Sequence, residues 1–134
     1  MSIQQIQPLY LIVGEQRVSP FDHQTYRRFK LWVASTFGRG NIETFDQENI
    51  TIEHWDEQAA DPYPNLLNPC ECGAFLPMEV DPGPMLSSAI GLLSDMTALK
   101  CHYDKMKPAF QNIIDQLCVM AELSIDTNTT LEIR

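Results

Sequence analysis

The chain has 134 residues, of which 44% are hydrophobic and 20% are charged, and this composition excludes an intrinsically disordered protein. Its formal net charge of −9 argues against nucleic-acid binding, because contacts to phosphates need cations, and no apolar run reaches the roughly eighteen residues of a membrane span. The N-terminus lacks the basic lead and the cleavage site of a signal peptide. Together with four cysteines, this predicts a cytoplasmic protein with reduced thiols.

The first 37 residues predict a strand followed by a helix. Residues 8–13, PLYLIV, form a short apolar run that ends at Gly14 and is typical of a mostly buried strand. Ser19 can cap a helix, and Pro20 suits the first helical position. The helix then carries a stripe at helical spacing, which we interpret as core: Phe21, Thr25, Phe29, Trp32, Val33, Thr36 and Phe37.

Residues 41–55 predict a β-hairpin with a loop at 47–49. In this register the isoleucines point inward, and Glu43 lies directly opposite Glu53 on the other face. Like charges in that position destabilise a sheet by a few tenths to about 1 kcal/mol, so the pair suits a surface that meets a cation. A slip of one residue would exchange the two faces.

A proline-rich stretch, residues 61–84, separates this half from a helical one. It holds six of the nine prolines and two of the four cysteines, and we expect a long loop without helix. Its apolar residues predict that the loop is ordered and packed across the domain. These residues are Leu66, Leu67, Phe75, Leu76, Met78 and Val80.

Two helices are predicted after the loop. The first runs from Pro84 to about Tyr103 and has two apolar faces, so we expect a central core helix. The second begins at Asp104 or Lys107 and packs antiparallel to the first. Leu93 and Ile114 lie at the centres of the two apolar stripes, and truncation of either is expected to be severe.

The alternation TTLEIR at residues 129–134 adds a predicted edge strand. The whole chain, residues 1–134, is therefore interpreted as a single α+β domain. We expect a small, mainly antiparallel sheet packed against about three helices, with a long ordered central loop that contains the prolines and Cys70 and Cys72.

Cysteine spacing offers one candidate metal site. Cys70-Glu71-Cys72-Gly73 resembles half of a zinc knuckle, although the usual spacing has two intervening residues and a closed tetrahedral site needs a second pair. Cys101 and His102 are the remaining candidates. Because the ligand set is incomplete, we expect no metal and no other cofactor, and a small zinc-binding domain is kept as an alternative.

Catalysis is not indicated by any motif. Cys101, His102 and Asp104 are close in sequence, but adjacent helical residues point about a hundred degrees apart and cannot form a relay. The chain also lacks a phosphate-binding glycine loop. We therefore expect a non-catalytic protein.

The distribution of charge favours a binding function. Residues 40–99 contain eleven acidic residues and no Lys or Arg. Such a surface suits a basic protein partner, with aromatics as anchors and charges for steering. The hypothesis is an inhibitor or immunity-type protein, with a subunit of a larger assembly as a further alternative and a homo-oligomer left open. The predicted binding residues are Glu43, Phe45, Glu53, Trp55, Asp56, Glu57 and Asp61.

Overall fold

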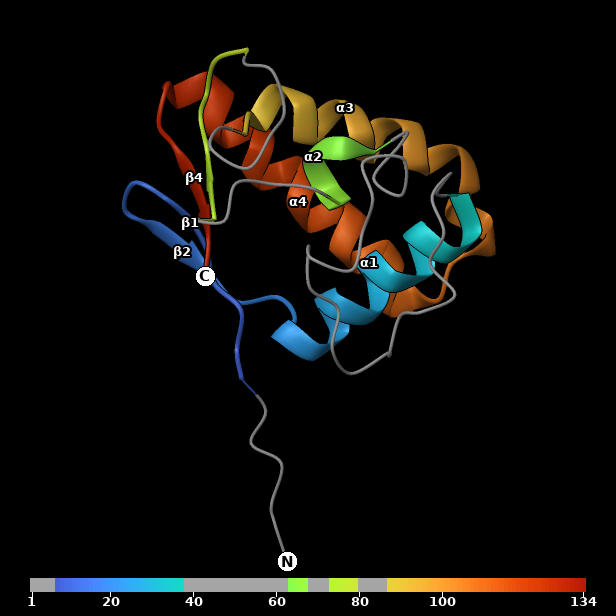
Figure 1. Cartoon of the computed structure of the whole chain (residues 1–134). Helices are drawn as coiled ribbons and strands as arrows, with labels where there is room; N and C mark the ends of the chain where they lie inside the picture. Colours follow the sequence, from blue (N-terminus) through green and yellow to red (C-terminus); the bar gives the residue numbers. More distant parts are fainter. Residues whose placement is uncertain (1–6, 38–62, 68–72, 80–86) are drawn as a thin grey trace, which may run out of the picture.

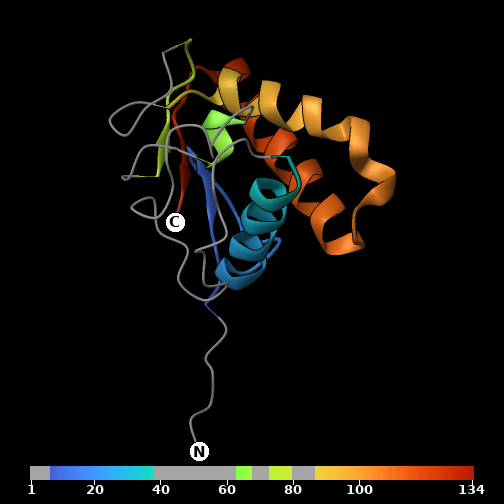
Figure 2. The ribbon, with the colours of Figure 1, turned by 45° about the vertical axis from the view of Figure 1, so that its right-hand side comes forward.

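The computed structural model describes residues 7–37, 63–67, 73–79 and 87–134. Strands gather at one side of the molecule, and helices pack together at the other (Figures 1 and 2). One antiparallel sheet and four α-helices in these ranges confirm the predicted α+β class. The elements are β1 (Leu11–Val13), β2 (Gln16–Val18), α1 (His23–Phe37), α2 (Pro64–Leu67), β3 (Ala74–Phe75), α3 (Ala89–Leu99), the 3-10 helix η3 (Lys100–Lys105), α4 (Pro108–Thr127) and β4 (Leu131–Ile133).

The sheet has the strand order β2-β1-β4-β3, and all neighbouring pairs are antiparallel. Leu131 of β4 lies opposite both Val13 of β1 and Phe75 of β3, and all three side chains belong to the hydrophobic core. The strand predicted at the C-terminus is confirmed, but its predicted place at an edge is wrong. β3 pairs with the side of β4 that faces away from β1. β4 therefore has hydrogen-bond partners on both sides, and Leu131 is covered.

The first strand continues into a hairpin that the sequence did not predict. Val13 pairs with Gln16, so β1 and β2 are joined by the two residues Gly14 and Glu15, and Gly14 has a φ of +59°. Glycine adopts this left-handed conformation without steric cost, as a two-residue hairpin loop requires. Residues 16–18 were overlooked because their side chains are mostly exposed and show no apolar alternation.

Helix α1 begins later than predicted. The backbone of Phe21 accepts a hydrogen bond from Leu9 N, and His23 N donates to Gln7 O, so this stretch is held beside residues 7–9 instead of in a helical turn. Asp22 caps the helix, since its Oδ1 accepts from Thr25 N at 2.6 Å. The predicted cap at Ser19 and first helical residue at Pro20 are therefore wrong.

The predicted stripe of α1 is core in part, since Phe21 and Trp32 are only partly buried and Thr36 is exposed. Phe29 and Val33 are fully buried, and the Phe29 ring meets that of Phe110 edge-on with centroids 5.5 Å apart. Trp32 contacts the same Phe110 ring from the side, at 5.8 Å. These contacts fix α1 against the first turn of α4.

The central loop contains a helical turn, contrary to the prediction that excluded helix from it. Pro64 is the first residue of α2, a position where the missing backbone N–H of proline costs nothing. The predicted packing of the loop is confirmed for Leu66, Leu67 and Phe75, which are buried. It is wrong for Met78, which is 54% exposed.

Helices α3 and α4 form the largest helical contact. Ser88 caps α3 by accepting a hydrogen bond from Gly91 N at 2.9 Å, and Leu76 pairs with Ser88 as a bridge, so the helix starts at Ala89. Pro84, where a helix start was predicted, lies outside the described residues. The second long helix, α4, starts at Pro108 with Lys107 as its N-cap. This agrees with the predicted start at Lys107 and not with the one at Asp104.

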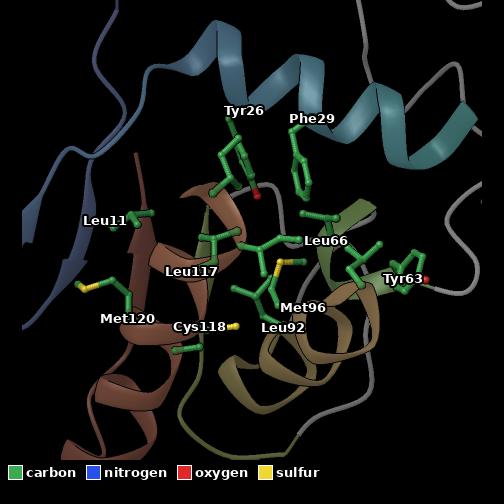
Figure 3. Close-up of a cluster of buried hydrophobic side chains, with 14 of the residues drawn as sticks. Leu11, Tyr26, Phe29, Tyr63, Leu66, Leu92, Met96, Leu117, Cys118 and Met120 are labelled. Atoms are coloured by element: carbon green, nitrogen blue, oxygen red, sulfur yellow. The ribbon is translucent and has the colours of Figure 1, made fainter. Parts of the chain in front are cut away.

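Only one face of α3 is core. Leu92, Met96 and Leu99 are fully buried. Figure 3 shows Leu92 and Met96 on the side of α3 that faces Leu117 of α4. The other apolar face predicted for this helix, which contains Ile90 and Leu93, is not a core face. Ile90 is 36% exposed and Leu93 is only partly buried. Leu93 was thus misassigned to the centre of the stripe, whereas Ile114 was placed correctly.

Candidate functional site

Negative charge is concentrated in one stretch of the sequence. Residues 40–99 hold eleven of the eighteen acidic residues and no Lys or Arg, whereas the rest of the chain holds seven acidic and nine basic residues. Nine of the eighteen acidic residues belong to the ranges that the structure describes, and the other nine lie in segments outside them.

The predicted binding residues belong to those segments. Their positions in the sequence place all of them outside the described residues: Glu43, Phe45, Glu53, Trp55, Asp56, Glu57 and Asp61. The hairpin predicted at residues 41–55 lies there as well. These expectations stay predictions.

Only two of the four metal candidates belong to the residues that the structure describes. Cys70 and Cys72 lie outside the described residues, while Cys101 and His102 lie in η3, where Cys101 is exposed and His102 is half-buried. Within residues 7–37, 63–67, 73–79 and 87–134, no group of three or more His, Cys, Asp or Glu side chains could hold a metal ion.

One acidic residue of the 40–99 stretch, Asp95, is buried inside the fold and was not among the predicted site residues. Asp95 of α3 is 7% exposed and lies on the buried side of the helix. Its Oδ2 accepts hydrogen bonds from two backbone donors at the start of α2, Asn65 N at 2.8 Å and Leu66 N at 3.2 Å. A carboxylate on one helix thus caps a turn that lies thirty residues earlier in the chain.

The environment of Asp95 disfavours its charge. Burial raises the pKa of its carboxyl to about 6, and the hydrogen bonds from the Asn65 and Leu66 backbones and from the Asn65 side chain only partly oppose that rise. Tyr63, just before α2, is also buried. Burial raises the pKa of its phenol, and the nearby Asp95 and Cys101 raise it further. Figure 3 places Tyr63 at the margin of the core, beside Leu66.

Asn65 completes this site. It is 5% exposed, and its Oδ1 has no hydrogen-bond partner among the described residues. Its side chain lies flat against Gly91 of α3, where an added Cβ would come within 2.4 Å of both Oδ1 and Nδ2. Tyr63, Asn65, Gly91 and Asp95 together form what we call the α2 anchor.

A sequence signal for the anchor existed. Asp95 is the only charged residue of α3, and it falls between Leu92 and Leu99 at the spacing of the core face. A lone carboxylate at a core position needs hydrogen-bond donors. Because the donors are backbone groups of a distant segment, their identity could not be read from the helix.

A second set of polar residues joins η3 to α4. Tyr103 donates from its hydroxyl to Asp115 Oδ2 at 2.8 Å, and Gln111 Nε2 donates to Tyr103 O at 2.9 Å. Cys118, one helical turn beyond Asp115, is buried, and burial raises the pKa of its thiol. A thiol that resists ionisation is a poor nucleophile.

No family model, curated protein or solved structure matches the chain. None of the helices in the described ranges is long and apolar enough to cross a membrane.

Proposed function

We propose that this protein is a non-catalytic binding domain whose acidic segments dock on a basic protein partner, in the manner of an inhibitor or immunity-type protein. The observation that carries the proposal is the separation of charge along the sequence. Residues 40–99 contain eleven acidic residues and no Lys or Arg, whereas the rest of the chain contains seven acidic and nine basic residues.

This separation favours recognition over mere solubility. Charge that served only to keep the protein dispersed could be spread over the scaffold, whereas concentrated charge of one sign raises the potential locally and steers an oppositely charged partner. Phe45 and Trp55 lie in the same acidic stretch, and aromatic side chains are common anchors at the centres of interfaces.

The test compares two double variants with the same change in charge. Glu43→Lys with Glu53→Lys alters the proposed binding face, and Glu122→Lys with Asp126→Lys alters two exposed positions on α4 of the scaffold. Tagged wild-type protein is used to isolate and identify a partner from the source cells. Association of the purified pair is then measured by surface plasmon resonance over a series of salt concentrations.

We expect the first variant to lose binding and the second to bind like wild type. For wild type, the association rate should fall most as salt rises, because screening acts on steering. Equal losses for both variants would indicate a response to net charge alone. Binding by the first variant at wild-type affinity would contradict the proposal.

A further inference from the structure

The α2 anchor joins a very short helix to the core through one carboxylate. A four-residue helix is not stable by its own hydrogen bonds, because ordering the backbone of the first turn costs more free energy than the hydrogen bond of that turn contributes. Its first backbone donors depend on Asp95 Oδ2, and its packing depends on the absence of a side chain at Gly91. Leu66 and Leu67 then bury their side chains in the core.

The anchor places two polar groups where they are poorly solvated. A carboxylate that is 7% exposed has lost most of its hydration, and the neighbouring Asn65 Oδ1 has no described partner. Detachment of α2 would return both groups to water. The attached state is therefore the one that disfavours the negative charge on Asp95.

We propose that Asp95 is a proton-operated latch, whose neutral form holds α2 against α3 and whose ionised form loosens α2. A neutral carboxyl group keeps a carbonyl oxygen that accepts from Asn65 N and Leu66 N, and it removes the cost of a buried charge.

The sign of the effect follows from the anchor's surroundings. The pKa of Asp95 is raised to about 6 when α2 is attached, against an ordinary value of 3.8. Attachment is therefore most favourable below pH 3.8, weakens as pH rises through 6, and levels off at higher pH, where both states are ionised. The other titratable group of the described residues that acts here is the Tyr63 phenol. Burial raises its pKa, so it stays neutral over this pH range and Asp95 dominates.

Amide hydrogen exchange tests the latch without a partner. The exchange of Asn65, Leu66 and, for comparison, Leu117 is followed by NMR between pH 5 and pH 7, after division by the intrinsic chemical rates. The two α2 amides should exchange faster than Leu117 at every pH, because α2 opens locally. Their opening equilibrium should rise about tenfold over this range in wild type.

Asp95→Asn should abolish that rise, and Asp126→Asn, an exposed carboxylate on α4, should retain it. A pH-independent opening in wild type, or an equal rise in Asp95→Asn, would overturn the latch. So would exchange of the α2 amides at the rate of Leu117, which would mean that α2 opens only with the whole domain.

A direct measurement covers the case in which Asp95→Asn does not fold. The side-chain carboxyl carbon of Asp95 is titrated by NMR in the wild-type protein. A midpoint near pH 6 supports the latch, and a midpoint at or below pH 4 overturns it, whatever the outcome of the partner-binding experiment.

Discussion

Two residues without charge, Gly91 and Asn65, determine how closely α2 approaches α3. The Asn65 side chain occupies the space that a side chain at position 91 would fill. Glycine within a helix usually costs about 1 kcal/mol relative to alanine. Here that cost is offset by the close approach of the Asn65 side chain that glycine permits.

Gly91→Ala should therefore destabilise the protein, against the trend for exposed helical sites. The added Cβ would lie 2.4 Å from the Asn65 amide, and crowding of this kind costs about 1–3 kcal/mol. Chemical denaturation measures the change, with Ser94→Ala on the exposed face of α3 as the matched control. A gain in stability for Gly91→Ala would show that α2 does not pack on this residue.

Helix starts illustrate how elements depend on their neighbours. Ser19-Pro20 is a good helix start by local preference, yet the backbone near Phe21 and His23 pairs with residues 7–9. This pairing delays α1 until Asp22 can cap it. Local capping preferences are worth about 1 kcal/mol, less than a set of backbone hydrogen bonds and buried side chains together.

The two candidate caps make opposite predictions. Asp22→Ala should cost about 1 kcal/mol, because Thr25 N loses its acceptor, and Ser19→Ala should be nearly neutral. Urea denaturation of both variants measures the difference. If Ser19→Ala were the more damaging change, the helix would begin where the sequence first suggested.

The different burial of residues in α3 and α4 predicts different losses of stability on truncation to alanine. Ile114 is fully buried and Leu93 only partly, so Ile114→Ala should cost about 2–5 kcal/mol and Leu93→Ala clearly less. Leu92→Ala, on the fully buried face of α3, should resemble Ile114→Ala. Equal effects of Leu92→Ala and Leu93→Ala in thermal unfolding would contradict the observed orientation of α3.

At the scale of the whole molecule, the described strands and helices are joined by a single hydrophobic core. Strands from both ends of the chain and helices α1 to α4 share one hydrophobic cluster. Figure 3 shows side chains of β1, α1, α2, α3 and α4 meeting within it. Burial of this kind is the dominant stabilising term in a domain of this size.

Chelation should accordingly leave the fold intact. With EDTA present, the thermal midpoint and circular dichroism should match those of untreated protein, because Cys101 and His102 form no ligand cluster with other residues that the structure describes. Elemental analysis supplies the complementary measurement. Stoichiometric zinc together with loss of the folded signal on chelation would favour the alternative of a zinc-binding domain that uses Cys70 and Cys72.

The sequence by itself determined the α+β class, β1, the core stripe of α1, and α4 with its core residue Ile114. These features follow from the spacing of apolar residues and from prolines, which act over a few neighbouring positions. It also identified the acidic stretch as the candidate binding region, and its residues remain candidates.

Only the tertiary structure decided the interior position of β4, the later start of α1, the helical turn at Pro64–Leu67 and the burial of Asp95. Each depends on a partner far away in the chain: β3 beside β4, residues 7–9 beside Phe21, and the α2 backbone at Asp95. Local patterns carry little information about such pairings, because the favourable contacts exist only once distant segments have been brought together.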